Sequence, residues 1–183
     1  NIKILLNSVV TEGEMTPKQR DKLLAEMTDE VAQLVLRDNY FQNQVLAVTR
    51  ARETEVFDEQ ARYMRYLGSV GRLNRRIEFL PSDEVIAERR QARRGLTAPE
   101  LAVLLAYSKM ELYELVLASD VPEDPYIATT LARYFPKPLR ERFAAQILRH
   151  PLKREIIATH VVNSMVNRVG PTFVNGLREE TGC

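Results

Sequence analysis

Glycine is scarce in this sequence of 183 residues, and tryptophan is absent. Among the seven glycines, Gly68 and Gly71 form a lone GSVG string with no further glycine beside it. A dinucleotide-binding loop needs glycines between a strand and a helix, where the backbone approaches a pyrophosphate. The residues around GSVG have a helical pattern instead. The pair therefore predicts a helix bend or a close helix contact rather than a phosphate-binding loop.

Side chains that bind metals or act as nucleophiles are also few. The two histidines, His150 and His160, do not have the spacing of metal ligands, and no cysteine pair accompanies them. Cys183 is the only cysteine, so no internal disulfide is possible, which suits a reducing compartment such as the cytoplasm. No serine or cysteine lies in a recognisable nucleophile motif. We expect no catalytic residue, no cofactor-binding residue and no metal ligand in this chain.

An excess of charge of one sign is missing as well. The chain has 26 basic and 25 acidic residues, and a net charge of +1 gives no reason to expect nucleic acid or a charged membrane as a partner. The longest purely apolar run, Leu101 to Tyr107, is too short to span a bilayer. The opening residues IKILLNSVV lack the basic start of a signal peptide, and Asn1 is not an initiator methionine. The sequence therefore has the character of a piece of a longer protein.

Signals for the start and end of helices recur along the whole chain. Thr16, Pro17 and Gln19 form a capping box with proline at the first helical position. The predicted helices begin at Pro17, cover residues 28–50 and 53–79, lie between Ser82 and Gly95, run from Thr97 past Leu115, and then cover residues 126–134, 139–149, 152–169 and 171–180. No alternation of period two persists. We expect an all-α fold, a multi-helix bundle of about eight to nine short and medium helices with no sheet.

The turn-rich string SDVPEDP is the best internal boundary. It divides the chain into a helical segment of residues 1–118 and a C-terminal helical subsegment of residues 119–183 that packs on it. A single domain of residues 1–183 is the alternative.

Arginine is concentrated in the middle third of the chain. The residues are Arg62, Arg65, Arg72, Arg75, Arg76, Arg89, Arg90, Arg93 and Arg94. Arginine suits phosphate oxygens, so this stretch could bind RNA. However, the aromatic residues Tyr63, Tyr66 and Phe79 fit a helix core rather than a base-stacking surface. We expect a solvated face or a subunit contact paired with acidic partners, and keep an independent module that binds RNA or an acidic protein as the alternative function.

The predicted helix over residues 152–169 combines an apolar surface with a polar stripe. His160, Asn163, Ser164 and Asn167 are spaced so that they share one side of the helix. The stripe could face solvent or cap neighbouring helices, or it could form a buried polar network that fixes the helix register. An effector pocket is a third alternative. Carboxylate pairs such as Glu179 and Glu180 lie at helix ends and are interpreted as solvated charge.

Three blocks of sequence resemble one family. They are NIKILLN at the start, LTAPELAVLLAYSKMELYELVLASDVPEDPY from Leu96, and the stretch from Tyr134 to Val174 with RERFAAQILRHPL, REIIAT and VNRVGPTF. All three, in order, are similar to the large bacterial-type NAD-specific glutamate dehydrogenase, in the helical region that follows its catalytic core. Residues 49–76 are less distinctive.

The resemblance implies a parent enzyme that converts L-glutamate, water and NAD to 2-oxoglutarate, ammonium and NADH. Its substrate lysines, catalytic aspartate and nucleotide loop belong to the preceding core, and none has a matching position here. The resemblance implies NAD in the parent but no cofactor in this segment, a cytoplasmic homo-oligomer, and the catalytic core of the same chain as partner. A structural, assembly or regulatory role is expected for the segment, without membrane or nucleic acid.

Overall fold

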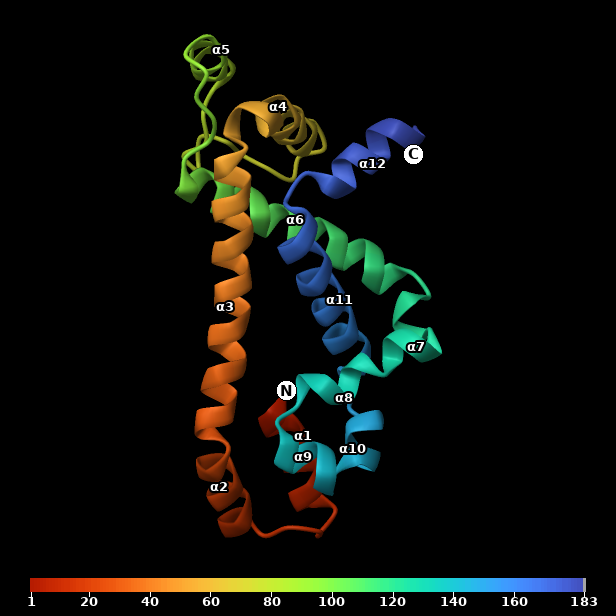
Figure 1. Ribbon diagram of the computed structural model, residues 1–183. Coiled ribbons are helices and arrows are strands. Elements are labelled where there is room, and N and C mark those ends of the chain that lie inside the picture. Colours follow the sequence, from red (N-terminus) through yellow and green to blue (C-terminus); the bar gives the residue numbers. More distant parts are fainter. Residues whose placement is uncertain (183) are drawn as a thin grey trace. The chain divides into compact units, whose positions relative to one another are not determined.

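The computed structural model describes residues 1–182, and this part of the chain is built of helices joined by turns and loops, with no strand (Figure 1). The helices are α1 (Ile2–Thr11), α2 (Pro17–Glu26), α3 (Thr28–Ala51), α4 (Glu53–Ser69), α5 (Asp83–Gln91), α6 (Ala98–Ala118), the 3₁₀ helix η1 (Val121–Glu123), α7 (Pro125–Ala128), α8 (Thr130–Tyr134), α9 (Lys137–Arg142), α10 (Ala144–Leu148), α11 (Lys153–Val169) and α12 (Phe173–Thr181). The predicted all-α fold is confirmed. Cys183 lies outside the described residues.

The helices are more numerous than the eight or nine predicted, because α1 was not among the predicted helices and two predicted helices are each broken in the middle. Residues 126–134 form α7 and α8, and residues 139–149 form α9 and α10. At Phe143 the backbone leaves the helical region, with φ −129° and ψ 35°, and this residue separates α9 from α10. Elsewhere the start signals are accurate. Thr16 and Gln19 form the predicted capping box, and Ser82 accepts a hydrogen bond from the Val85 amide at the start of α5.

The predicted helix over residues 53–79 is too long. Helix α4 ends at Ser69, and residues 70–82 form a loop in which the second residue, Gly71, is left-handed, at φ 72°. The Phe79 side chain, expected in a helix core, is 90% exposed. The left-handed residue after α5 is Arg93, with φ 53°, and not Gly95, the glycine that closes the predicted helix. Gly95 is needed for a different reason, because a Cβ atom there would lie 2.6 Å from the Cβ of Glu53.

The chain divides into two compact units, each made of two separate stretches. One unit combines residues 1–39 with 115–162, and the other combines residues 40–114 with those from 163 onward. The predicted boundary between residues 118 and 119 separates two domains rather than these compact units, and it stays a prediction. In the first unit α1 and α2 meet α8 to α11 around a core that includes Leu6, Phe135 and Ile157. His150 is buried there, accepts a hydrogen bond from the Leu152 amide at Nδ1, and lies 3.2 Å through Nε2 from the Asn1 carbonyl.

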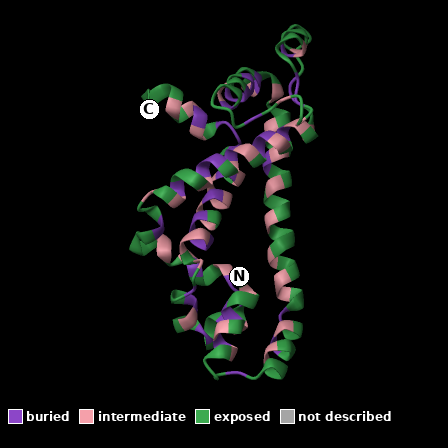
Figure 2. Ribbon diagram, turned by 180° about the vertical axis from the view of Figure 1, so that it is seen from behind, coloured by how far each residue is buried: buried purple, intermediate pink, exposed green. Residues whose placement is uncertain are grey.

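The core of the second unit lies between α4, α5 and α6. On α4, Phe57, Ala61 and Met64 follow the i, i+4, i+7 spacing of one helix face, and all three are buried. Burying a side chain as large as Phe or Met contributes about 1.5–3 kcal/mol. Helix α3, in contrast, has Val45 as its one buried residue, and Figure 2 shows the rest of it as exposed or half-buried. None of the helices in residues 1–182 combines the length and apolar content that a bilayer crossing requires.

Candidate functional site: the Glu111 network

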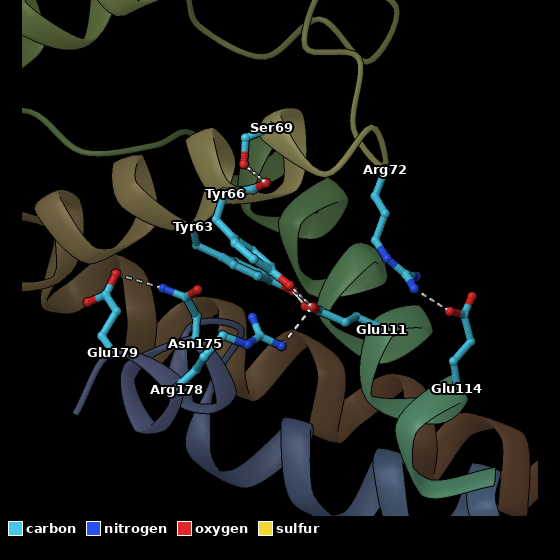
Figure 3. A network of polar contacts seen from close by, with 9 residues as sticks. All are labelled: Tyr63, Tyr66, Ser69, Arg72, Glu111, Glu114, Asn175, Arg178 and Glu179. Atoms are coloured by element: carbon cyan, nitrogen blue, oxygen red, sulfur yellow. Dashed lines mark hydrogen bonds and ion pairs between the residues drawn. The ribbon is translucent and has the colours of Figure 1, made fainter. Parts of the chain in front are cut away.

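The most elaborate polar arrangement of the second unit is centred on the carboxylate of Glu111, on α6. Glu111 is only 5% exposed. Its Oε2 atom accepts a hydrogen bond from the Tyr63 hydroxyl at 2.8 Å, and its Oε1 atom accepts one from the Tyr66 hydroxyl at 3.0 Å. The Arg178 Nη2 atom, on α12, donates to the same Oε1 atom at 2.9 Å (Figure 3). A buried carboxylate requires partners of this kind, because an unpaired charge away from water is costly.

Local helix geometry places the two tyrosines. Tyr63 and Tyr66 are three residues apart on α4 and so lie on one side of the helix. Their rings are stacked, with centroids 6.4 Å apart and planes inclined by 13°. The Arg178 guanidinium lies 4.3 Å from the centre of the Tyr66 ring, a cation–π contact. Arg178 therefore contacts both a negative carboxylate and the electron-rich face of an aromatic ring.

The electrostatics make the tyrosines hydrogen-bond donors rather than bases. Burial, followed by the nearby charge of Glu111, raises the pKa of Tyr63 well above its ordinary value of 10.0. Burial and the hydrogen bond to Glu111 also raise the pKa of Tyr66. Both phenols therefore stay protonated near neutral pH and donate to Glu111. Because three donors occupy the carboxylate, the arrangement suits joining α4, α6 and α12 better than proton transfer to a substrate.

Further ion pairs extend the network along α12. Arg62 on α4 donates to Glu179 through Nε at 3.0 Å, and Asn175, which is 4% exposed, donates to the same carboxylate at 3.0 Å. Thr172, just before α12, donates to Glu59 at 3.2 Å. Glu179 is exposed, which agrees with its interpretation as solvated charge, and folding adds a surface ion pair with the α4 arginine. Helix α12 is thus held against α4 and α6 chiefly by polar side chains.

Most arginines of the arginine-rich third are paired with acidic residues of the same unit. Six of the nine arginines make ion pairs: Arg62 with Glu179, Arg65 and Arg75 with Asp83, Arg72 with Glu114, Arg89 with Glu100, and Arg90 with Asp58. Arg89 makes the least exposed of these pairs, donating to both oxygens of Glu100 at 2.7 and 2.9 Å. Within residues 1–182, Arg76, Arg93 and Arg94 make no ion pair. Few arginines therefore remain available for phosphates.

The polar stripe of α11 lies apart in sequence from this network and is neither buried nor fully exposed. His160, Asn163, Ser164 and Asn167 are all half-buried, while Val162 and Val166 of the same helix are buried. The structure does not bring the stripe together with a cluster of metal-binding side chains, since residues 1–182 contain no group of three His, Cys, Asp or Glu side chains placed to hold an ion. Whether the stripe acts as a network stays a prediction.

The sequence analysis missed Glu111 and Arg178, although one signal was present. Leu101, Leu104, Ser108 and Glu111 are spaced i, i+3, i+7 and i+10, and all four are buried along one face of α6. A carboxylate that continues an apolar stripe must have a buried partner. The pattern could therefore have identified Glu111, but it contains nothing that indicates Arg178.

Comparisons with known proteins cover nearly the whole chain. Residues 1–49 match the family described as bacterial NAD-glutamate dehydrogenase, catalytic domain, and residues 93–183 match glutamate dehydrogenase, C-terminal. The whole chain aligns with proteins named NAD-specific glutamate dehydrogenase, at 50% identity in Pseudomonas aeruginosa, 46% in Halomonas elongata and 44% in Mycobacterium tuberculosis. Each alignment includes 100% of this chain but only 11% of the length of the relative.

Proposed function

Because the chain belongs to the family of NAD-specific glutamate dehydrogenases, as a segment about one ninth as long as its relatives, we propose that it is a non-catalytic helical part of such an enzyme. The enzyme would oxidise L-glutamate with NAD to 2-oxoglutarate, ammonium and NADH. The segment would support assembly or the closing of the catalytic cleft, since hydride transfer requires a site closed to water. In this proposal NAD and the substrate bind to parts of the enzyme outside these 183 residues.

The observation that carries the proposal is how the buried polar groups are used. Glu111, the most buried carboxylate described, accepts hydrogen bonds from three side chains that connect three helices. An enzymatic acid or base needs at least one position open to its substrate. Here the buried polar side chains form hydrogen bonds that hold helices together, which fits a structural role.

The partners follow from the same proposal. Residues 1–49 match a catalytic-domain family and residues 93–183 match a C-terminal family, so the remainder of the catalytic domain in the same polypeptide is the first partner. We further propose a homo-oligomeric parent that acts in the cytoplasm. The alternative of an RNA-binding module is less well supported, because six of the nine arginines are already paired with carboxylates.

A comparison of the 183-residue chain with the full-length enzyme tests the proposal. NADH formation from L-glutamate and NAD is followed at 340 nm for both, and NAD binding is measured by calorimetry. We expect turnover and binding only for the full-length enzyme. Turnover by the 183-residue chain would refute the proposal. Filter binding of RNA at low and high salt tests the alternative, which predicts retention at low salt that falls steeply as salt rises.

A further inference from the structure

The loop between α4 and α5, residues 70–82, displays two large apolar side chains to solvent. Phe79 is 90% exposed and Ile77 is 68% exposed, while Leu73 and Leu80 near the two ends of the loop are buried. Exposed apolar residues are common singly. Two of them on one loop, at the highest exposures found among the large hydrophobic side chains of the second unit, form a distinct surface feature. We call Ile77 and Phe79 the apolar tip.

The loop is held in one conformation by its own hydrogen bonds. The Asn74 side-chain oxygen accepts from the amides of Arg76 and Ile77 at 3.1 and 3.2 Å. The Leu80 amide donates to the Arg75 carbonyl at 2.8 Å. Arg75 also donates from Nη1 to the Pro81 carbonyl at 3.3 Å and to Asp83 at 3.1 Å. The apolar tip is therefore presented by a preorganised loop, and a preorganised surface loses less entropy when it binds.

The backbone of Phe79 adds an independent observation. Its φ angle is +54°, in the left-handed region that glycine and asparagine adopt far more readily than an aromatic residue. Strained residues of this kind persist where the surrounding structure enforces them, and they concentrate at functional positions. A solvent-facing turn at this position would accept Asn or Gly without strain. Phe79 makes physical sense if its ring has a contact to make.

We propose that the apolar tip inserts into an apolar pocket on the remainder of the catalytic domain of the same polypeptide. This contact rests on the proposed function. Two side chains bury only about 150–250 Å² each at most, far less than the roughly 1,200 Å² of a stable interface between separate proteins. A contact this small needs the high effective concentration of a covalent connection. The chain enters the second unit directly from residues that match the catalytic domain, so that domain is connected to the loop by covalent linkage.

The position of the loop in the sequence and the charges of the loop also favour the catalytic domain as its partner. Residues 50–92, which contain the loop, lie between the catalytic-domain match and the C-terminal match. The exposed Arg76 beside the tip makes no ion pair within residues 1–182, so the pocket would carry a carboxylate at its rim. Arg72 and Arg75 are already paired with Glu114 and Asp83, which favours a protein partner over nucleic acid.

Hydroxyl-radical labelling of the full-length enzyme, read by mass spectrometry, tests the proposal. The labelling rate of Phe79 in the urea-unfolded enzyme is divided by the rate for the same residue in the folded enzyme. We expect Phe79 to be labelled at least about fivefold more slowly in the folded enzyme, and to the same degree at every enzyme concentration. Labelling within about twofold of the unfolded rate would overturn the proposal. So would protection that disappears on dilution, which indicates a second copy, or protection that needs added RNA.

A pair of variants of the full-length enzyme separates the contact from ordinary surface effects. Phe79→Ser removes the ring, and Tyr126→Ser removes another aromatic side chain, which is 81% exposed in the first unit. We expect Phe79→Ser to raise the rate of limited proteolysis within residues 50–92 at least threefold, and Tyr126→Ser to leave it unchanged. Equal rates for the two variants would overturn the proposal. Neither labelling nor proteolysis depends on turnover. A failure of the proposed contact is therefore distinguishable from a failure of the proposed function, which catalysis by the 183-residue chain would refute.

Discussion

Glu111 on α6 and Arg178 on α12 are 67 positions apart in the sequence, and the Arg178 Nη2 atom lies 2.9 Å from a carboxylate oxygen of Glu111. The Glu111 side chain is 6% exposed and the Arg178 side chain 24%. Their contact, reinforced by the two tyrosine hydroxyls, connects the last helix to the core of the second unit (Figure 3). A charge pair this far from solvent makes the stability of the unit sensitive to the loss of either partner.

Glu111→Ala should therefore lower the free energy of unfolding by about 3 kcal/mol, because the Tyr63 hydroxyl and the Arg178 guanidinium would lose their acceptor. Urea unfolding followed by circular dichroism measures the change. Glu114→Ala is the matched control, since Glu114 lies one turn further along α6 and pairs with Arg72 at the surface. Its loss should be under about 1 kcal/mol. Equal losses for the two variants would contradict a buried role for Glu111.

Tyr63 should make stability fall at high pH. Its folded pKa lies above the ordinary 10.0, so above about pH 10 the unfolded chain binds fewer protons than the folded chain. The contribution of Tyr63 is fully present below pH 10 and is lost as the pH rises further, by about 1.4 kcal/mol per pH unit. Tyr63→Phe should make this slope shallower in urea unfolding between pH 9 and 11.5. A slope unaltered by Tyr63→Phe, compared with Tyr126→Phe as control, would be inconsistent with the buried phenol.

Gly95→Ala should destabilise the second unit by about 1–3 kcal/mol, because its new Cβ would overlap Glu53 Cβ at 2.6 Å and force the backbone apart. Gly176→Ala is the control. Nothing lies within 4 Å of the Cβ position of Gly176 on α12, and alanine favours a helix by up to about 1 kcal/mol over glycine. Thermal unfolding should shift in opposite directions for the two variants.

Phe79→Asn should stabilise the 183-residue chain by about 1 kcal/mol, since asparagine tolerates the left-handed backbone better than an aromatic residue does. Ile77→Asn is the control for removing an exposed apolar side chain without a positive φ, and it should change stability by less than about 0.5 kcal/mol. Chemical denaturation measures both variants. A loss of stability in Phe79→Asn would show that the ring packs within this chain.

Asn163→Ala tests the polar stripe of α11. Asn163 is half-buried, and its side chain makes no hydrogen bond within residues 1–182, so the free energy of unfolding should change by less than about 0.5 kcal/mol. Val162→Ala, one residue before it and buried, should cost about 2 kcal/mol and serves as the comparison. A loss above about 1 kcal/mol in Asn163→Ala would favour a buried polar network.

Local signals predicted the helices well wherever the decisive interaction is local. The capping box of Thr16 and Gln19, the start at Ser82 and the extent of α3 depend on neighbours within one helical turn. The end of α4 was predicted ten residues too late, because the hydrophobic spacing continues into a loop. There Leu73 and Leu80 are buried by tertiary contacts rather than by a helix face.

The sequence by itself determined the all-α fold, because helix caps and apolar spacing act over a few residues. It also indicated the family, because the three blocks of sequence that resemble it are long. Only the tertiary structure decided which charges are neutralised. The carboxylates that pair with Arg62 and Arg72 lie on helices distant in the sequence, so the composition alone left an apparently basic surface. It also decided that Phe79 lies outside the core and Glu111 inside it. Burial depends on which helices meet, and residue spacing within one helix cannot specify its neighbours.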